Sequence, residues 1–286
     1  MNNLFWISGF TIFGLEIKFY GILMAVAFAV GFILVMRYAK QKGYSENLPF
    51  DLLLIVFPSA IVGARLNYVL FTLSERSWTF VEVLQIWHGG LMIYGGILFA
   101  VIAICIYCAI KKLNVFKIFD LIAPVLILGQ AIGRWGNFFN QEAYGSLITN
   151  PSFQWFPFGV YIESSHFTTN AAEQVQNFYG MAVEGAWFNA TFFYESIWCL
   201  GGFFLLHFLL KKTKITGLCT ATYLAYYGFE RFFVEMLRTD SLYIGSLRVS
   251  VLISGIIFLI GASYLVYLLV LHIKTKSQRL KKKNKD

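Results

Sequence analysis

Residues 133–145, GRWGNFFNQEAYG, place an arginine, two asparagines and a glutamate where a hydrophobic stretch ends. That stretch, at about 118–134, is apolar enough to cross a bilayer. An arginine within a span costs about 3 kcal/mol on insertion scales, so such a residue usually serves a function. Its guanidinium donates paired hydrogen bonds to phosphates, and the amides and carboxyl group beside it are further polar partners. The segment therefore predicts a site for a lipid head group.

Further ionisable residues occur within or beside other apolar stretches. Four residues are spaced by 4, 4 and 3 positions and share one face of a helix: Tyr227, Arg231, Glu235 and Arg238. The glycine-rich segment HGGLMIYGG, residues 88–96, leads into another apolar stretch. With Arg65, Asn67 and Glu195, these groups indicate a polar cavity with an excess of positive charge, which suits an anionic lipid phosphate.

Each of these features also has a purely structural interpretation. Arg65 or Arg238 alone is typical of an interfacial side chain or of an ion pair with a nearby glutamate. The two Gly-Gly pairs are typical of close helix packing. A single His88 is more often an interfacial histidine than a base, and Tyr20 and Tyr227 fit an aromatic belt. Their joint occurrence favours a functional cavity.

The composition indicates which elements position these residues. The chain has 286 residues, of which 58% are hydrophobic and 13% are charged, whereas soluble domains carry about 25% charged residues. A mean hydropathy of +0.66 agrees with a membrane protein of several spans. The net charge of +8 does not indicate a nucleic-acid partner, because seven basic residues lie in the tail 274–285. Such a tail is typical of a cytoplasmic end beside anionic lipid.

The four cysteines lie within or at the edge of apolar segments: Cys105, Cys108, Cys199 and Cys219. We interpret them as small buried hydrophobic residues rather than nucleophiles, and a metal site would need more ligands nearby. They therefore do not indicate a metal site. The N-terminal region lacks the pattern of a removable signal peptide.

Seven apolar segments approach the length that spans a bilayer. They are residues 19–36, 51–72, 92–110, 118–134, 191–210, 218–236 and 249–272. We expect an all-α membrane protein, a polytopic bundle of seven transmembrane helices that forms a single domain over residues 1–286. No clear internal repeat or linker marks a second domain.

The charges of the connections predict the orientation of these spans. Lysines and arginines follow the first, third and fifth spans, so we expect these connections and the tail 274–286 in the cytoplasm, with the N-terminus outside. Residues 137–190 contain no lysine or arginine and are expected to form a small extracytoplasmic head. In this orientation, nearly every ionisable residue within the spans lies toward the outer leaflet.

The motifs resemble those of a known family. The segment GRWGNFFNQEAYG fits the signature Gly-Arg-x-Gly-Asn-Phe-x-Asn-x-Glu-x-x-Gly of the prolipoprotein diacylglyceryl transferases. The other resembling segments follow in the family's order: KFYG near Tyr20, GARLNYVLF, IWHGGLMIYGG, FNATFFYES and YGFERFFVEMLRTDS. The resemblance therefore extends along most of the chain.

The resemblance implies a reaction in the bacterial cytoplasmic membrane. A diacylglyceryl group moves from phosphatidylglycerol to the thiol of the lipobox cysteine in a prolipoprotein signal peptide, and glycerol phosphate leaves. The thiolate attacks the glycerol carbon that bears the phosphate ester, and fixed arginines stabilise the departing phosphate. Because the nucleophile belongs to the substrate, the enzyme needs no catalytic cysteine of its own, and the implied reaction needs no metal and no organic cofactor.

The resemblance also assigns roles by position. Arg134 would bind the phosphate of phosphatidylglycerol, Arg231 matches an essential arginine, and Tyr20 matches a tyrosine near the start of the first span. The signature residues that would shape the site are Asn137, Asn140 and Glu142. The further substrate-binding candidates share the helix face of Arg231: Tyr227, Glu235 and Arg238.

One position departs from the family pattern. Many members have a histidine where this chain has Tyr94 in IYGG, and that histidine is the proposed activator of the thiol. A neutral tyrosine with a pKa near 10 is a poor general base at pH 7. His88, six residues upstream, is the other candidate for the base. The resemblance therefore leaves the proton acceptor open between Tyr94 and His88.

Two other classes of protein compete with a transferase. A transporter for an anionic solute also carries polar residues within its spans, but usually near the midplane and between repeated halves. A lipid-binding or assembly factor would share the head-group site without the reaction. The outer-leaflet position of the charges and the lack of an evident repeat favour the transferase.

Overall fold

The computed structural model describes residues 8–238, 243–244 and 247–283. Most of them are helical. The helices are α1 (Phe19–Gln41), α2 (Leu48–Thr72), α3 (Phe80–Leu84), α4 (Ile93–Ile110), α5 (Val115–Phe139), α6 (Thr169–Tyr179), α7 (Thr191–Lys212), α8 (Leu218–Leu237) and α9 (Val249–Lys283), with short 3-10 turns at Ile86–His88, Pro151–Phe153 and Ser164–His166. The strands are β1 (Gly9–Ile12), β2 (Leu15–Lys18), β3 (Gly159–Glu163), β4 (Gly185–Asn189), β5 (Tyr243–Ile244) and β6 (Leu247–Arg248). They pair as three two-stranded antiparallel sheets, β1 with β2, β3 with β4 and β5 with β6.

Six helices of the described chain are long and apolar enough to cross a membrane. They are α1, α2, α4, α5, α7 and the Val249–Gln278 part of α9. The predicted segments agree with these helices to within a few residues at most ends. Helix α8 coincides with the predicted segment 218–236 but is less apolar, because it carries Glu230, Arg231 and Glu235. A mostly helical membrane protein is thus confirmed, whereas the seventh span stays a prediction.

The chain forms two compact units. One comprises residues 1–31 and 120–286, and the other comprises Phe32–Phe119. In the second unit, α2 and α4 pack closely. A Cβ on Gly63 would lie 2.5 Å from the Phe99 side chain, and one on Gly95 would collide with the Gly63 carbonyl oxygen. The Gly-Gly pair at the start of α4 therefore serves helix packing.

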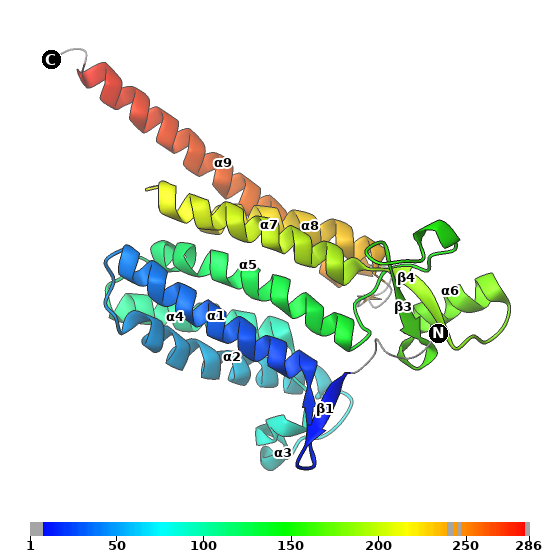
Figure 1. Ribbon diagram of the computed structural model, residues 1–286. Helices are drawn as coiled ribbons and strands as arrows, with labels where there is room; N and C mark the ends of the chain where they lie inside the picture. The colour runs from blue at the N-terminus through cyan, green and yellow to red at the C-terminus, as the bar shows by residue number, and fades with distance from the viewer. Residues whose placement is uncertain (1–7, 239–242, 245–246, 284–286) are drawn as a thin grey trace. The chain divides into compact units, whose positions relative to one another are not determined.

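In the first unit, α7, α8 and α9 lie side by side (Figure 1). Glycines permit the approach, since a Cβ on Gly228 of α8 would lie 2.7 Å from the main-chain nitrogen of Phe258 in α9. Similarly, a Cβ on Gly202 of α7 would lie 2.6 Å from the ring of Tyr226 in α8. Close main-chain approach through small residues is the usual device for packing helices within lipid. Helix α8 is therefore held against both neighbours.

A carboxylate in α5 fixes where α8 begins. Asp120 accepts hydrogen bonds from the Gly217 main-chain nitrogen at 2.6 Å and from the Thr220 nitrogen and hydroxyl at 2.8 Å each. The first amide groups of a helix lack partners within the helix. Asp120 therefore supplies from another helix the cap that α8 lacks in its own sequence, where Gly217 precedes it.

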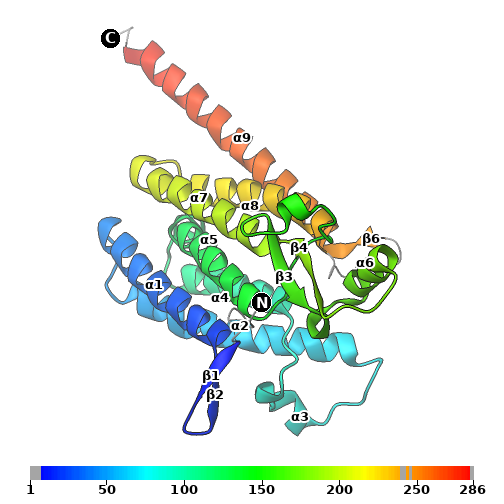
Figure 2. The same cartoon turned by 45° about the vertical axis from the view of Figure 1, so that its right-hand side comes forward.

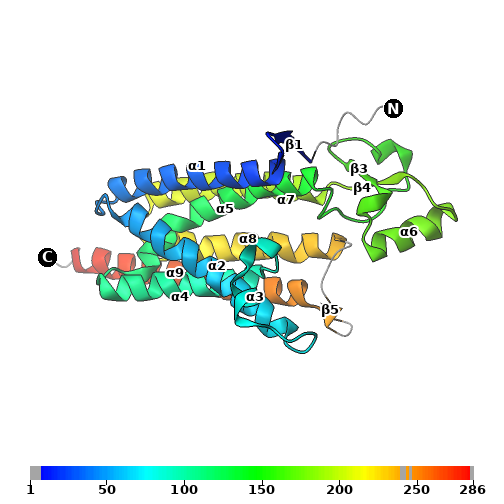
Figure 3. The same cartoon turned by 90° about the horizontal axis from the view of Figure 1, so that it is seen from below.

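Residues 140–190 form a small folded head in the same unit. Strands β3 and β4 pair in register from Gly159–Asn189 to Glu163–Gly185, and α6 lies beside them (Figure 2). Buried side chains of the head and of the start of α7 form one apolar core: Tyr144, Val160, Ile162, Ala171, Val175, Ala186, Phe188, Ala190 and Phe192. The head lies beyond the end of α5 and the start of α7 (Figure 3). A folded head at 137–190 was predicted; its side of the membrane remains a prediction.

Candidate active site

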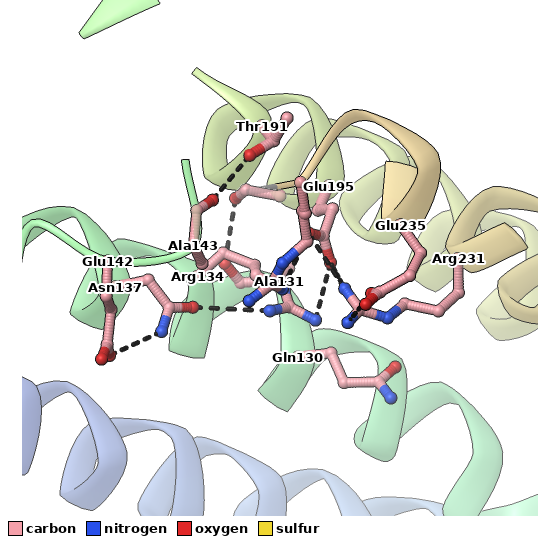
Figure 4. A network of polar contacts seen from close by, with 12 residues as sticks. Gln130, Ala131, Arg134, Asn137, Glu142, Ala143, Thr191, Glu195, Arg231 and Glu235 are labelled. Atoms are coloured by element: carbon pink, nitrogen blue, oxygen red, sulfur yellow. Dashed lines mark hydrogen bonds and ion pairs between the residues drawn. The ribbon is translucent and has the colours of Figure 1, made fainter. Parts of the chain in front are cut away.

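In the first unit, the fully buried carboxylate of Glu195 in α7 forms ion pairs with three arginines, two of which are labelled in Figure 4. Its Oε2 lies 2.6 Å from Nη2 of Arg134 and 3.2 Å from Nη1 of Arg231. Its Oε1 lies 3.7 Å from Nη1 of Arg238. Arg231 also pairs with Glu235 one turn later in α8. We call these five residues the arginine cluster.

Neighbouring contacts explain why Glu195 and Arg134 meet. Ser196 donates a hydrogen bond to the Ala131 carbonyl at 2.9 Å and accepts one from Trp135 Nε1 at 3.1 Å. These bonds fix the first part of α7 against the last turns of α5. Glu195, which precedes Ser196, and Arg134, which precedes Trp135, are therefore close enough to form an ion pair between the two helices.

The polar signature residues extend the same network toward the end of α5. Asn137 Nδ2 and Asn140 Nδ2 donate to Glu142 Oε1 at 2.8 and 3.2 Å, and Arg134 Nη1 donates to Asn137 Oδ1 at 3.5 Å. The chain can reverse here because Gln141 and Ala143 adopt positive φ angles of 51° and 58°. The signature is thus one hydrogen-bonded turn joined to the arginine cluster.

The side chains of the arginine cluster are largely removed from solvent. The three guanidinium side chains are 12–17% exposed, and the carboxylates of Glu195 and Glu235 are 0% and 2% exposed. A third carboxyl group, Glu230, is buried in α8 beside them. Each guanidinium has five N–H donors, more than these ion pairs occupy. The arrangement can bind an oxyanion by paired, charge-assisted hydrogen bonds.

Two predicted tyrosines lie in the same unit. The ring of Tyr20 packs so closely on Gly136 that any side chain there would collide with it, which explains this glycine of the signature. Tyr227 stacks on Tyr223 with ring centroids 5.8 Å apart and planes 3° apart. The Tyr223 hydroxyl accepts a hydrogen bond from Gln130 Nε2 at 3.0 Å. Both predicted tyrosines therefore belong to the packed surroundings of α5 and α8.

The second unit contains the glycine-rich segment, and Arg65 of α2 organises it. The buried guanidinium donates to the carbonyls of Val83 at 2.9 Å and Gly89 at 2.7 Å. It also donates to the carbonyls of Gly90, Glu82 and Gln85 at 3.0, 2.6 and 3.4 Å. All of these acceptors belong to the main chain between residues 82 and 90. Arg65 is therefore a structural clamp on the main chain of this loop, a role that neither the predicted interfacial side chain nor the predicted ion pair describes.

Of the two candidate bases, His88 lies within this loop, and Tyr94 follows it in α4. His88 is exposed and precedes Gly89 and Gly90, which adopt positive φ angles of 82° and 73°. Tyr94 is 44% exposed in the first turn of α4. A cavity of about 200 Å³ beside the loop is lined by Arg65, Tyr68, Arg76, Trp78, Glu82, Gln85, His88, Gly89 and Gly90.

A capping box holds the start of the short helix α3 in this loop. Thr79 and Glu82 bond reciprocally through their side chains and main-chain nitrogens. These hydrogen bonds from Thr79 lower the pKa of the Glu82 carboxyl. Glu82 thus stays ionised near neutral pH and pairs with Arg76 at 3.1 Å.

The cysteines agree with their predicted structural role except for one. All four are free thiols; Cys108, Cys199 and Cys219 are buried, whereas Cys105 is exposed on the apolar surface of α4. Among the residues that the structure describes, no group of three or more histidine, cysteine, aspartate or glutamate side chains is arranged to hold a metal ion.

The structure brings most predicted site residues into one network. It joins Arg134, Arg231, Arg238 and Glu235 through Glu195, and it joins Asn137, Asn140 and Glu142 through Arg134. His88 and Tyr94 belong to the other unit. Glu195 was predicted as part of the polar cavity but was not among the predicted binding residues. Its central position depends on how α5, α7 and α8 pack against one another, which the sequence pattern does not predict.

Comparison with known proteins gives a consistent result. Residues 8–267 match the family model described as prolipoprotein diacylglyceryl transferase. A Clostridium botulinum (strain Langeland) protein is 42% identical over 257 residues, which cover 89% of this chain and 94% of that protein. A Finegoldia magna protein is 39% identical over 277 residues, covering 96% and 98%, and a Clostridium kluyveri protein is 39% identical over 259 residues, covering 91% and 95%. All three relatives are named phosphatidylglycerol–prolipoprotein diacylglyceryl transferase.

Proposed function

Because this chain belongs to the prolipoprotein diacylglyceryl transferase family, we propose a mechanism in which its arginine cluster holds the phosphate of phosphatidylglycerol. The protein is a multi-pass transferase of the bacterial cell membrane and catalyses the first step of lipoprotein lipidation. The names of its relatives give phosphatidylglycerol and a prolipoprotein as substrates. The alternative of a transporter for an anionic solute has no support among these relatives.

The acceptor in this proposal is the thiol of the lipobox cysteine in a prolipoprotein signal peptide. Its sulfur forms a C–S bond with the glycerol carbon that carries the phosphate ester, and the C–O bond at that carbon breaks. The bonding electrons leave with the phosphate oxygen as glycerol phosphate, and the thiol proton passes to a base. Charge therefore develops on the leaving phosphate, where fixed donors lower the barrier most.

The convergence of Arg134, Arg231 and Arg238 on one buried carboxylate is the observation that carries the proposal. Glu195 fixes the three guanidiniums in advance of substrate binding. Donors that are already oriented need no reorganisation as charge develops. The remaining N–H groups of these arginines provide the paired donors that a phosphate accepts. Asn137, together with its partner Glu142, orients Arg134 from the other side.

We propose Tyr94 or His88 as the proton acceptor. Tyr94 occupies the position of the family's histidine, and His88 is the nearby imidazole. An imidazole titrates near neutral pH, whereas a phenol does not. The comparison of Tyr94→Phe with His88→Ala decides between them: an unaltered transfer rate in His88→Ala would exclude His88.

We also propose the topology that the charge pattern predicts. The chain crosses the cytoplasmic membrane seven times, with α8 as the sixth span, and it folds as one functional domain over residues 1–286. The N-terminus and the head at 137–190 face outward, and the basic tail 274–286 faces the cytoplasm. A lipid bilayer, phosphatidylglycerol and lipobox signal peptides are then its partners.

Replacement of the cluster arginines tests the proposed function. Arg134→Ala and Arg231→Ala are each expected to abolish transfer of labelled diacylglyceryl from phosphatidylglycerol to a lipobox peptide in proteoliposomes, while the protein still inserts. Arg37→Ala, an exposed arginine of α1, is the matched control and should retain the wild-type rate. Unimpaired transfer in both cluster variants would contradict the proposal. Detection of released glycerol phosphate separates a transferase from a protein that only binds lipid.

A further inference from the structure

Glu230 is a buried carboxyl group that the proposed mechanism does not use. The residue is 5% exposed within α8, and neither of its carboxyl oxygens has a hydrogen-bond partner within the described residues. Every other carboxyl group near it is paired, since Glu195 meets three guanidiniums and Glu235 meets Arg231. Glu230 is not among the predicted site residues, because it lies outside the helix face that Tyr227, Arg231 and Glu235 share.

The absence of hydrogen bonds constrains the charge of this group. An ionised carboxylate removed from water without hydrogen bonds is strongly disfavoured. A protonated carboxyl group carries no net charge and is far less costly to bury. Of the neighbouring charges, that of Glu195 disfavours a second negative charge on Glu230, whereas the three arginines of the cluster favour one, so the missing hydrogen bonds and the burial carry the argument.

Charged groups face Glu230 from several elements. They come from α5, α7, α8 and the residue after α8: Arg134, Glu195, Arg231 and Arg238. The uncharged titratable neighbours are Cys199 and Tyr226. Helix α9 carries no lysine, arginine, aspartate or glutamate between Val249 and Leu271. Arg248, before α9, donates instead to the main-chain carbonyls of Glu235 and Met236.

We propose that Glu230 is a neutral carboxylic acid, which leaves the arginine cluster with one net positive charge for a lipid phosphodiester. The cluster then contains three positive guanidiniums and two negative carboxylates, those of Glu195 and Glu235. A phosphodiester such as that of phosphatidylglycerol carries one negative charge, whereas a phosphomonoester carries close to two. A neutral Glu230 thus matches the site to the diester and selects against the monoester. This inference rests on the proposed function for its ligand but not for the protonation state.

Infrared spectroscopy tests the protonation state directly. The carbonyl stretch of a protonated carboxylic acid is separate from the carboxylate bands. The spectrum of the wild-type protein minus that of Glu230→Gln, both in nanodiscs near neutral pH, is expected to contain the acid carbonyl band. Glu173→Gln, which removes an exposed glutamate of the head, is the control and should remove only carboxylate bands. Loss of carboxylate bands without the acid band in Glu230→Gln would overturn the proposal.

Lipid selectivity tests the consequence for charge. The probes are short-chain phosphatidylglycerol, a monoanion, and short-chain phosphatidic acid, a phosphomonoester, each titrated into the purified protein. Glu235→Gln removes an ionised carboxylate one turn from Glu230 and is expected to shift the ratio of the two dissociation constants about tenfold toward the monoester. Glu230→Gln exchanges one neutral group for another, so its ratio should not shift toward the monoester.

The outcomes separate this inference from the proposed function. If Glu230→Gln shifts the ratio toward phosphatidic acid as Glu235→Gln does, Glu230 is ionised and the inference is wrong. If phosphatidylglycerol does not bind to the wild-type protein at all, the proposed function fails, and the infrared band still decides the state of Glu230. The infrared result also stands alone if Glu235→Gln does not fold.

Discussion

At the scale of single residues, the site depends on a carboxylate that contacts no substrate in the proposed mechanism. Glu195 is fully buried and faces three guanidiniums. Without it, like charges from three arginines would repel one another in a region with little water to screen them. Its role is thus to hold the positive groups close together before the phosphate arrives.

Glu195→Gln is therefore expected to harm stability and transfer together. Removal of one partner from a buried ion pair costs about 3–5 kcal/mol, because the other charges stay buried. We expect a large fall in the thermal unfolding midpoint in detergent and a loss of labelled-lipid transfer. Glu173→Gln in the head is the control, since its side chain is exposed. Equal midpoints for the two variants would show that Glu195 does not stabilise the cluster.

Arg65 illustrates a different use of a buried arginine. Its N–H groups donate hydrogen bonds to main-chain carbonyls between Glu82 and Gly90, and its guanidinium carbon lies 5.0 Å from the centroid of the Trp78 ring. A lysine keeps the charge but lacks the planar fork that reaches several carbonyls at once.

For Arg65→Lys we expect looser main chain in the loop that carries His88. The amides of residues 82–90 should exchange hydrogen about tenfold faster or more, which corresponds to about 1.4 kcal/mol of lost local stability. Arg76→Lys is the matched control, because Arg76 is half-exposed and makes a single ion pair, with Glu82. Unchanged exchange in Arg65→Lys would contradict the clamp.

The sequence predicted much of this site at residue level. The signature GRWGNFFNQEAYG and the spacing of Arg231, Glu235 and Arg238 identified side chains that the structure joins in one network, while their roles in binding and catalysis stay predictions. The sequence did not predict that Glu195 is the centre or that Glu230 lacks partners. Both facts depend on the rotation of α7 and α8 about their own axes. A sequence predicts this rotation from an amphipathic pattern, and apolar helices that pack within lipid show little of one.

At the scale of elements, hydrophobic length located the helices well. Segments predicted at 191–210 and 218–236 correspond to α7 at Thr191–Lys212 and α8 at Leu218–Leu237. The glycine pairs were harder to interpret. Gly89 and Gly90 adopt positive φ in a loop, whereas Gly95 packs α4 against α2. The same dipeptide thus serves two purposes, and only the neighbouring helix distinguishes them.

The cap on α8 gives a prediction at this scale. Asp120→Ala removes the acceptor for the Gly217 and Thr220 amides and is expected to destabilise the protein by about 1–2 kcal/mol. Asp120→Asn retains one acceptor oxygen and should lose less. Hydrogen exchange of the amides at 217–221 would locate the effect. Equal stability of Asp120→Ala and the wild-type protein would show that α8 needs no cap from α5.

At the scale of the whole molecule, the proposed mechanism requires one orientation. Phosphatidylglycerol must meet an exported signal peptide, so the arginine cluster and the head must face outward. The distribution of basic residues supports this orientation, because residues 137–190 lack lysine and arginine, whereas the tail 274–285 contains seven lysines and arginines. Basic segments remain on the cytoplasmic side during insertion.

Single introduced cysteines test this orientation in intact cells. Ser164→Cys in the exposed turn after β3 should react with a membrane-impermeant maleimide added outside. Ser277→Cys, near the exposed end of α9, should react only after the membrane is permeabilised. The parent protein is the control for its native thiols, of which Cys105 alone is exposed, on an apolar helix surface. Labelling of Ser277→Cys before Ser164→Cys would invert the topology and place the arginine cluster on the side where exported prolipoproteins do not present their thiol.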